Sequence, residues 1–230
     1  PLGARTRKAR LKGVFSVGKA AEKTDFILKN RIKKHKKVTI KMIDLLSLHK
    51  QFILTHVKEG DICADFTMGN GNDTLFLSKA VGESGRVYAF DIQEDALIST
   101  KDHLVTNGAP ENYELICASH HRVKEFVEGP IKAGMFNLGY LPRSGKKFVT
   151  TMRETTMPAV EAAIEMLSPD GVLIIAIYPG HKEGELEGDM LREYFKTLSK
   201  YRICASEFHI LNSPMSPYFY LIEKSPRCKD

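Results

Sequence analysis

The sequence predicts an α/β fold built on a seven-stranded, mostly parallel sheet that ends in an antiparallel hairpin. Short apolar runs alternate with helical patterns, which is typical of βαβ units. The last two runs are separated only by residues 211–217, which leave no room for a helix, so we expect these strands to pair antiparallel. The seven predicted strands are residues 62–66, 86–90, 113–117, 133–138, 172–178, 203–210 and 218–223.

Five segments carry the helical spacing of apolar residues. In the first, Leu46, Ile53 and Val57 recur on one side of an amphipathic helix. Gly82 and Gly108 follow the second and third segments, where glycine is a frequent helix terminator. The predicted helices are residues 42–57, 73–81, 94–106, 155–167 and 187–200.

The charge is distributed unevenly along the 230 residues. Residues 1–41 hold fourteen Lys and Arg against two acids, a balance of +12, so the rest carries −6 of the overall +6. We expect a boundary near Val38, with a basic N-terminal arm at residues 1–37 and one α/β domain at residues 38–230. Such an arm favours a polyanion such as RNA as partner, although its composition also suits an organelle presequence.

The composition is that of a globular protein with one sizeable core, since 43% of residues are hydrophobic and 27% charged. No apolar run approaches the roughly 18 residues that cross a bilayer, so we expect a cytoplasmic protein without a membrane partner. The four cysteines, Cys63, Cys117, Cys204 and Cys228, include no Cys-x-x-Cys pair. They predict free, mostly buried thiols and no metal site.

A glycine-containing loop joins the first strand to the next helix and is a candidate cofactor site. Glycines let the backbone pass close to a ligand, and helix-start amides favour anionic groups. A dinucleotide-binding loop would require glycine at Thr74, so a nicotinamide oxidoreductase is a poor alternative. The pattern fits better the Asp-x-Gly-x-Gly-x-Gly loop of methyltransferases, with Thr67 at the first glycine position; a ligand-free turn remains the alternative. The candidate residues are Asp65, Thr67, Gly69, Asn70, Gly71, Asp73 and Thr74.

Two further strand ends carry candidate cofactor residues. Asp91 closes the second strand and can accept hydrogen bonds from ribose hydroxyls, with Ile92 and Gln93 beside it. The alternative for Asp91 is a helix cap. Ser119 and His120 end the third strand beside the expected adenine pocket, although His120 could equally be a surface histidine.

The fourth and fifth strands end in candidate catalytic residues. Asn137 and Tyr140 have the spacing of the Asn-Pro-Pro-Tyr element of amine methyltransferases, in which an amide oxygen and a backbone carbonyl hold the target N–H groups. Leu138 and Gly139 replace the prolines, and the alternative is that Asn137 caps a turn. His181 follows the fifth strand and could accept a proton or contact phosphate.

Together these segments resemble one bacterial family that bears the label rRNA methylase and is similar to tRNA methyltransferases acting on wobble 5-aminomethyl-uridine. The resemblance spans roughly residues 42–224 and does not cover the basic arm. It implies a Rossmann-like class I methyltransferase fold, S-adenosylmethionine as cofactor and N-methylation of the aminomethyl group. It also implies the tRNA anticodon stem-loop as partner and leaves a homodimer open. Methylation of rRNA, or RNA binding without catalysis on the same fold, are the alternatives.

Overall fold

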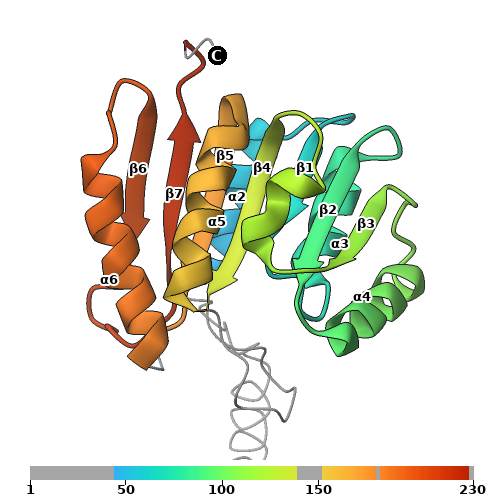
Figure 1. Ribbon diagram of the computed structural model, residues 1–230, viewed down its shortest axis with the longest axis horizontal. Helices are drawn as coiled ribbons and strands as arrows, with labels where there is room; N and C mark the ends of the chain where they lie inside the picture. The colour runs from blue at the N-terminus through green and yellow to red at the C-terminus, as the bar shows by residue number, and fades with distance from the viewer. Residues whose placement is uncertain (1–43, 139–151, 180–181, 228–230) are drawn as a thin grey trace, which may run out of the picture. The chain divides into compact units, whose positions relative to one another are not determined.

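The computed structural model describes residues 44–138, 152–179 and 182–227, and its centre is one seven-stranded sheet. The strand order is β3-β2-β1-β4-β5-β7-β6 (Figure 1). The strands are β1 (Ile62–Asp65), β2 (Arg86–Asp91), β3 (Tyr113–Cys117), β4 (Ile131–Leu138), β5 (Leu167–Ile177), β6 (Ile203–Phe208) and β7 (Tyr218–Lys224).

The predicted fold class is confirmed by the pairing of the strands. β1 to β5 pair in parallel, whereas β7 pairs antiparallel with both β5 and β6. Successive strands are added on one side of β1 as far as β3, and on its other side from β4 onward. The strand order therefore reverses between β1 and β4, which places a topological switch point at their carboxyl ends. Open α/β sheets bind ligands at such a point.

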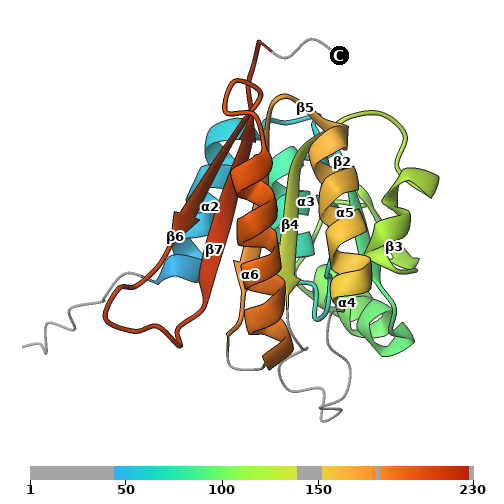
Figure 2. The same cartoon turned by 60° about the vertical axis from the view of Figure 1, so that its left-hand side comes forward.

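Helices cover both faces of the sheet, as Figure 2 shows with α2 behind the strands and α5 and α6 in front. All five predicted helices are present. Gly82 and Gly108 adopt φ values of 64° and 61° just beyond α3 and α4, as expected for helix terminators. The helices are α2 (Leu45–His56), α3 (Asn72–Val81), α4 (Glu94–Thr106), α5 (Arg153–Met166) and α6 (Lys182–Thr197).

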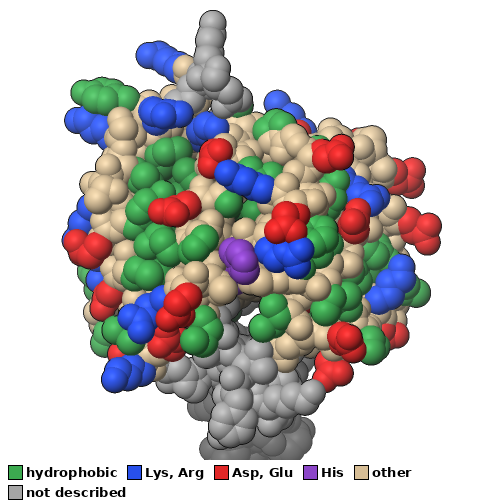
Figure 3. Space-filling view, viewed as in Figure 1, with side chains coloured by type: hydrophobic (Ala, Val, Ile, Leu, Met, Phe, Trp, Pro, Cys, Tyr) green, Lys and Arg blue, Asp and Glu red, His purple; other side chains and the backbone are tan. Residues whose placement is uncertain are grey.

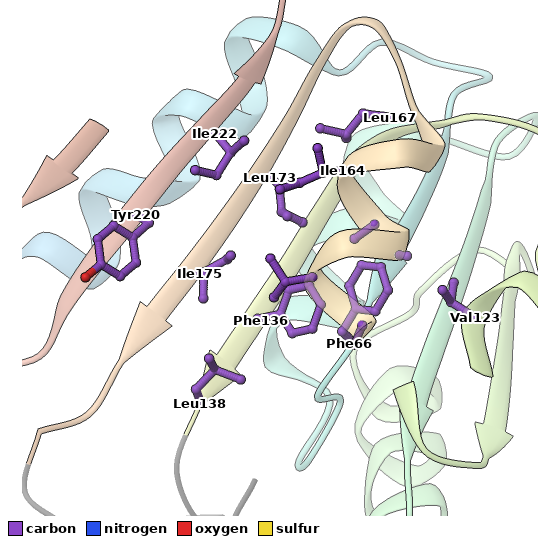
Figure 4. Close-up of a cluster of buried hydrophobic side chains, with 14 of the residues drawn as sticks. Phe66, Val123, Phe136, Leu138, Ile164, Leu167, Leu173, Ile175, Tyr220 and Ile222 are labelled. Carbon is purple, nitrogen blue, oxygen red and sulfur yellow. The ribbon is translucent and has the colours of Figure 1, made fainter. Parts of the chain in front are cut away.

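Two apolar cores lie on opposite faces of the sheet and fix the side on which each β4 side chain points. Phe66 and Phe136 stack on the α5 face with ring centroids 4.1 Å apart (Figure 4). Met135, one residue earlier in β4, belongs to the core on the α2 and α3 face. Because side chains alternate along a strand, Asn137 shares the face of Met135 and points toward α2 and α3.

The structure differs from the sequence prediction at several segments, among them α6, which spans Lys182–Thr197 where a helix over residues 187–200 was predicted. β5 begins at Leu167 rather than at residue 172, because Leu167 pairs with Ile131 before the chain bulges through Asp170, whose φ is 60°. Proline, aspartate and glycine in this stretch are typical of a loop and conceal the pairing. A short 3-10 helix, His120–Glu125, follows β3 and was not predicted.

The three cysteines that the structure describes are free as expected, but the expectation that the thiols are mostly buried is wrong for two of them. Cys63 is buried in β1, whereas Cys117 and Cys204 are exposed. Cys117 lies on β3 and Cys204 lies on β6, and these are the two edge strands of the sheet. Edge strands leave part of their side chains uncovered.

The described residues all belong to one compact unit. The proposed boundary near Val38 falls outside the described residues. Within the described ranges, no helix is long and apolar enough to cross a membrane.

Candidate functional site

The loop between β1 and α3 is organised around the carboxylate of Asp65. This side chain is fully buried, and Oδ1 accepts a hydrogen bond from the Thr67 amide at 3.1 Å. Oδ2 accepts from the Thr74 hydroxyl at 2.6 Å. Burial, reinforced by the nearby Asp73 carboxylate, raises the pKa of Asp65 to about 7. Both oxygens of Asp65 therefore hold the loop in shape.

The two glycines of this loop adopt conformations that suit glycine. Gly69 and Gly71 have φ values of 50° and 79°, in the left-handed region. A Cβ at Gly71 would also lie 2.9 Å from Cγ2 of Thr100 in α4. The Thr100 hydroxyl in turn donates to the carbonyl of Gly69 at 3.0 Å. The loop is thus packed closely against α4.

Asp91 lies at the end of β2 and faces this loop. Its Oδ2 accepts a hydrogen bond from the Gly69 amide at 3.1 Å, and its Oδ1 accepts from the Gln93 amide at 3.0 Å. Gln93, not Asp91, is the N-cap residue of α4, so the helix-cap alternative for Asp91 is wrong. Each carboxylate oxygen retains capacity for another donor. The side chain of Ile92 is 59% exposed beside it.

His120 follows β3 and is buried, so the surface-histidine alternative is wrong. Its Nδ1 lies 3.1 Å from the carbonyl oxygen of Phe66, while Nε2 is buried without a hydrogen-bond partner among the described residues. Burial lowers the pKa of His120 to about 4, so the ring is neutral near pH 7. A neutral ring whose Nδ1–H donates to Phe66 leaves Nε2 as an acceptor.

Two further cofactor candidates, Asn70 and Ser119, make contacts of their own. Asn70 accepts a hydrogen bond from the Ser99 hydroxyl at 3.2 Å, which ties the loop to α4. Ser119 Oγ lies 2.8 Å from Nδ1 of His121. Both side chains are partly exposed at the carboxyl edge of the sheet.

Asn137 lies in β4, one residue before its end, and the turn that it would cap in the alternative interpretation falls outside the described residues. Its backbone amide donates to the Thr67 hydroxyl at 2.7 Å, which joins β4 to the glycine loop. Its side-chain Nδ2 donates to Oδ2 of Asp73 at 2.8 Å. The other two candidate catalytic residues, Tyr140 and His181, lie outside the described residues.

Three residues that sequence reasoning did not select also lie at this site. Lys50 of α2 forms an ion pair with Asp73, with Nζ 2.7 Å from Oδ1. The Tyr178 hydroxyl donates to Oδ1 of Asn137 at 3.4 Å, and burial raises the pKa of Tyr178. His49 is buried beside Phe219, without a partner for either ring nitrogen among the described residues. A polar residue on the apolar side of α2 was the signal that could have found His49.

The sheet order, the antiparallel hairpin and the glycine loop facing Asp91 define a class I S-adenosylmethionine-dependent methyltransferase. The family model described as "Putative rRNA methylase" matches residues 87–224, and the ubiE/COQ5 methyltransferase family model matches residues 22–138. The chain belongs to this rRNA methylase family, as its motifs indicate.

Named relatives agree with this assignment. The chain is 35% identical over 178 residues to the chloroplastic tRNA (mnm(5)s(2)U34)-methyltransferase of Arabidopsis thaliana. The match spans 73% of this chain and 65% of the length of that protein. The crystal structure of the "putative rRNA-methylase" of Clostridium thermocellum is 36% identical, with a TM-score of 0.77, and covers 80% of this chain and 100% of that one. A "putative methyltransferase" of Streptococcus mutans, solved in complex with S-adenosylhomocysteine (SAH), is 35% identical, with a TM-score of 0.72, and the match covers 80% of this chain and 99% of that one.

Proposed function

We propose that this chain transfers a methyl group from S-adenosylmethionine to the aminomethyl nitrogen of wobble 5-aminomethyl-uridine in tRNA. The observation that carries the proposal is the Asn137 amide, whose nitrogen is engaged by Asp73. Among the described residues, its oxygen receives one long hydrogen bond, from Tyr178, and it has a second lone pair for an N–H donor. The name of the Arabidopsis thaliana relative supports the choice of nucleotide.

The residues of the glycine loop and its neighbours fit the proposed cofactor. Asp91 has the acceptor capacity for ribose hydroxyls, and the exposed Ile92 offers an apolar surface for a flat base. His120, whose buried ring packs against Phe136 and contacts the Phe66 carbonyl, is proposed to support the adenine side of this site. When bound, the cofactor supplies a methyl group already activated by a positive sulfur. The other residues of the glycine loop, Asp65, Thr67, Gly69, Asn70, Gly71 and Thr74, complete the proposed cofactor site together with Gln93 and Ser119.

The chain's own contribution to the reaction is mainly positioning. An amide oxygen that accepts one N–H of the target fixes the direction of the nitrogen lone pair, and orientation of this kind supplies a large part of catalysis. An alkylamine is mostly protonated near pH 7, so the target must lose a proton before it reacts. Tyr140, His181 or a water molecule is the proposed proton acceptor.

Transfer of radiolabelled methyl groups tests the proposal. The full chain is incubated with labelled S-adenosylmethionine and tRNA that lacks only the final methyl group at the wobble position. We expect label in that nucleotide, identified by nucleoside mass spectrometry, and none in tRNA with an unmodified wobble uridine. Binding of the cofactor without transfer to the aminomethyl tRNA would overturn the assignment.

Methylation of rRNA is the second candidate function, because the matching family and the Clostridium thermocellum structure are both described as rRNA methylases. The same assay with ribosomal subunits in place of tRNA separates the two. Label in rRNA but not in tRNA would favour this candidate. RNA binding by the chain without transfer to either RNA would favour a non-catalytic role.

A further inference from the structure

A continuous line of polar contacts joins α2, α3, β4 and the residue that follows β5. Lys50 of α2 lies 2.7 Å from Oδ1 of Asp73, at the start of α3. Oδ2 of the same carboxylate accepts a hydrogen bond from Asn137 of β4 at 2.8 Å. The Tyr178 hydroxyl, just beyond β5, contacts the other end of that amide at 3.4 Å. Asp73 is therefore the shared partner of Lys50 and Asn137.

The chemistry of a carboxylate decides which end of the amide it binds. A carboxylate can only accept hydrogen bonds, whereas an amide has a donor end and an acceptor end. Asp73 therefore binds the nitrogen of Asn137 and turns the oxygen the other way. An amide rotated by half a turn would present its NH2 group to the target, and an amine N–H would then meet another donor.

Lys50 holds the Asp73 carboxylate in place, and this carboxylate in turn holds the Asn137 amide. Its ammonium occupies Oδ1 of Asp73, which leaves Oδ2 for Asn137. The same ammonium lies 5.0 Å from the centre of the Phe76 ring, a cation–π contact that restrains the lysine side chain. The carboxylate of Asp73 is only 12% exposed, so water screens the ion pair less than it would on the surface.

We propose that Lys50 and Asp73 are positioning residues that hold the Asn137 amide with its oxygen toward the target, so that the site selects a nucleophile bearing N–H groups. This inference rests on the proposed function, in which Asn137 contacts the target nitrogen. It gives Asp73 a role toward Asn137, in place of the cofactor contact expected from its position in the glycine loop.

Two measurements on the full chain test the inference. The first is single-turnover methyl transfer at saturating cofactor and aminomethyl tRNA. Asp73→Asn and Lys50→Met are each expected to slow transfer by about 10- to 100-fold, because a small misplacement of a positioning group has effects of this size. Lys50→Arg should restore most of the rate, and Lys79→Met, on the exposed side of α3, should leave it unchanged. Cofactor affinity should change less than about twofold in every variant, since the loss concerns orientation rather than binding.

The second measurement is independent of any substrate. The side-chain NH2 signal of Asn137 is identified in an NMR spectrum of asparagine-labelled protein by its loss in Asn137→Ala. In the wild type we expect slow hydrogen exchange of this group, because it is held by a carboxylate. Lys50→Met and Asp73→Asn should both speed the exchange, and Lys50→Arg should not.

The outcomes distinguish a failure of this inference from a failure of the proposed function. Equal transfer rates for Lys50→Met and Lys79→Met, or a double variant of Lys50 and Asp73 much slower than Asp73→Asn alone, would overturn the inference. The inference would also be overturned if the lower activity of Asp73→Asn were explained by a lower affinity for the cofactor. If the wild type methylates no aminomethyl tRNA, the proposed function fails. The NMR signal then still decides whether Lys50 and Asp73 hold the amide.

Discussion

The backbone amide of Gly69 donates a hydrogen bond of 3.1 Å to Oδ2 of Asp91. This contact joins the glycine loop after β1 to the end of β2, so the loop and the proposed ribose-binding acid are held as one unit. The second oxygen of Asp91 is held by the Gln93 amide at 3.0 Å. The carboxylate therefore has a fixed orientation before any ligand arrives, which reduces the entropy lost on binding.

Replacing this carboxylate should impair cofactor binding. In Asp91→Asn the new NH2 group faces one of the two backbone amides that the acid now accepts. We expect the affinity for S-adenosylmethionine to fall by about 10- to 100-fold, the effect of losing a charge-assisted hydrogen bond. Isothermal titration calorimetry measures this, with Glu94→Gln at the exposed start of α4 as control. An affinity equal to that of the control would show that Asp91 does not contact the cofactor.

Removing the amide of Asn137 should affect transfer and spare cofactor binding. Asn137→Ala deletes the proposed acceptor for the target N–H, and we expect the rate of methyl transfer to fall by about 100-fold or more. The backbone amide that donates to Thr67 is retained, so the glycine loop should keep its shape. Rapid-quench assays with aminomethyl tRNA report the rate, and a wild-type rate in the variant would rule out the proposed contact.

The sheet, and the site residues at its strand ends and glycine turns, could be predicted from the sequence. Asp65, Gly69 and Asp91 were selected because strand ends and glycine turns leave a pattern within a few residues. Lys50 and Tyr178 were missed because their role depends on which side of the sheet α2 covers, and long-range packing sets that. The exposure of Cys117 was missed for a similar reason, since strand order and not local pattern makes β3 an edge strand.

The basic arm should supply salt-dependent RNA affinity. The face in Figure 3 shows Lys and Arg side chains interspersed with Asp and Glu, whereas residues 1–41 carry a balance of +12. Deleting residues 1–37 is expected to weaken RNA binding by about tenfold or more at 0.1 M salt and to flatten its salt dependence. Fluorescence anisotropy with labelled tRNA measures both. An unchanged RNA affinity would favour a targeting role for the arm.

The buried Asp65 should make stability depend on pH. Its pKa is raised from 3.8 to about 7, so between these values the folded protein binds more protons than the unfolded chain. The contribution of this group to stability is therefore full below about pH 4 and is lost as the pH rises through about 7. In Asp65→Asn the amide can still accept from Thr67 and can donate to Thr74, without a titrating proton. Urea unfolding should show the variant gaining stability relative to the wild type between pH 5 and pH 8; parallel profiles would contradict this.

The buried His49 is expected to destabilise the folded protein. Both ring nitrogens are buried without partners among the described residues, and the ring meets Phe219 edge-on at 6.0 Å between centroids. An unsatisfied buried polar atom costs about 1–3 kcal/mol, so His49→Phe, which keeps a similar ring shape, should stabilise the fold by about 1 kcal/mol or more.

Thermal unfolding of both proteins measures this, and 1 kcal/mol corresponds to about 2–4 °C in a domain of this size. The gain should be larger at pH 5 than at pH 8. Burial lowers the pKa of His49 below its usual 6.5, so as the pH falls the unfolded wild type takes up a proton at this residue before the folded protein does. A variant that unfolds at a lower temperature than the wild type at both pH values would show that the imidazole makes a favourable contact which phenylalanine cannot replace.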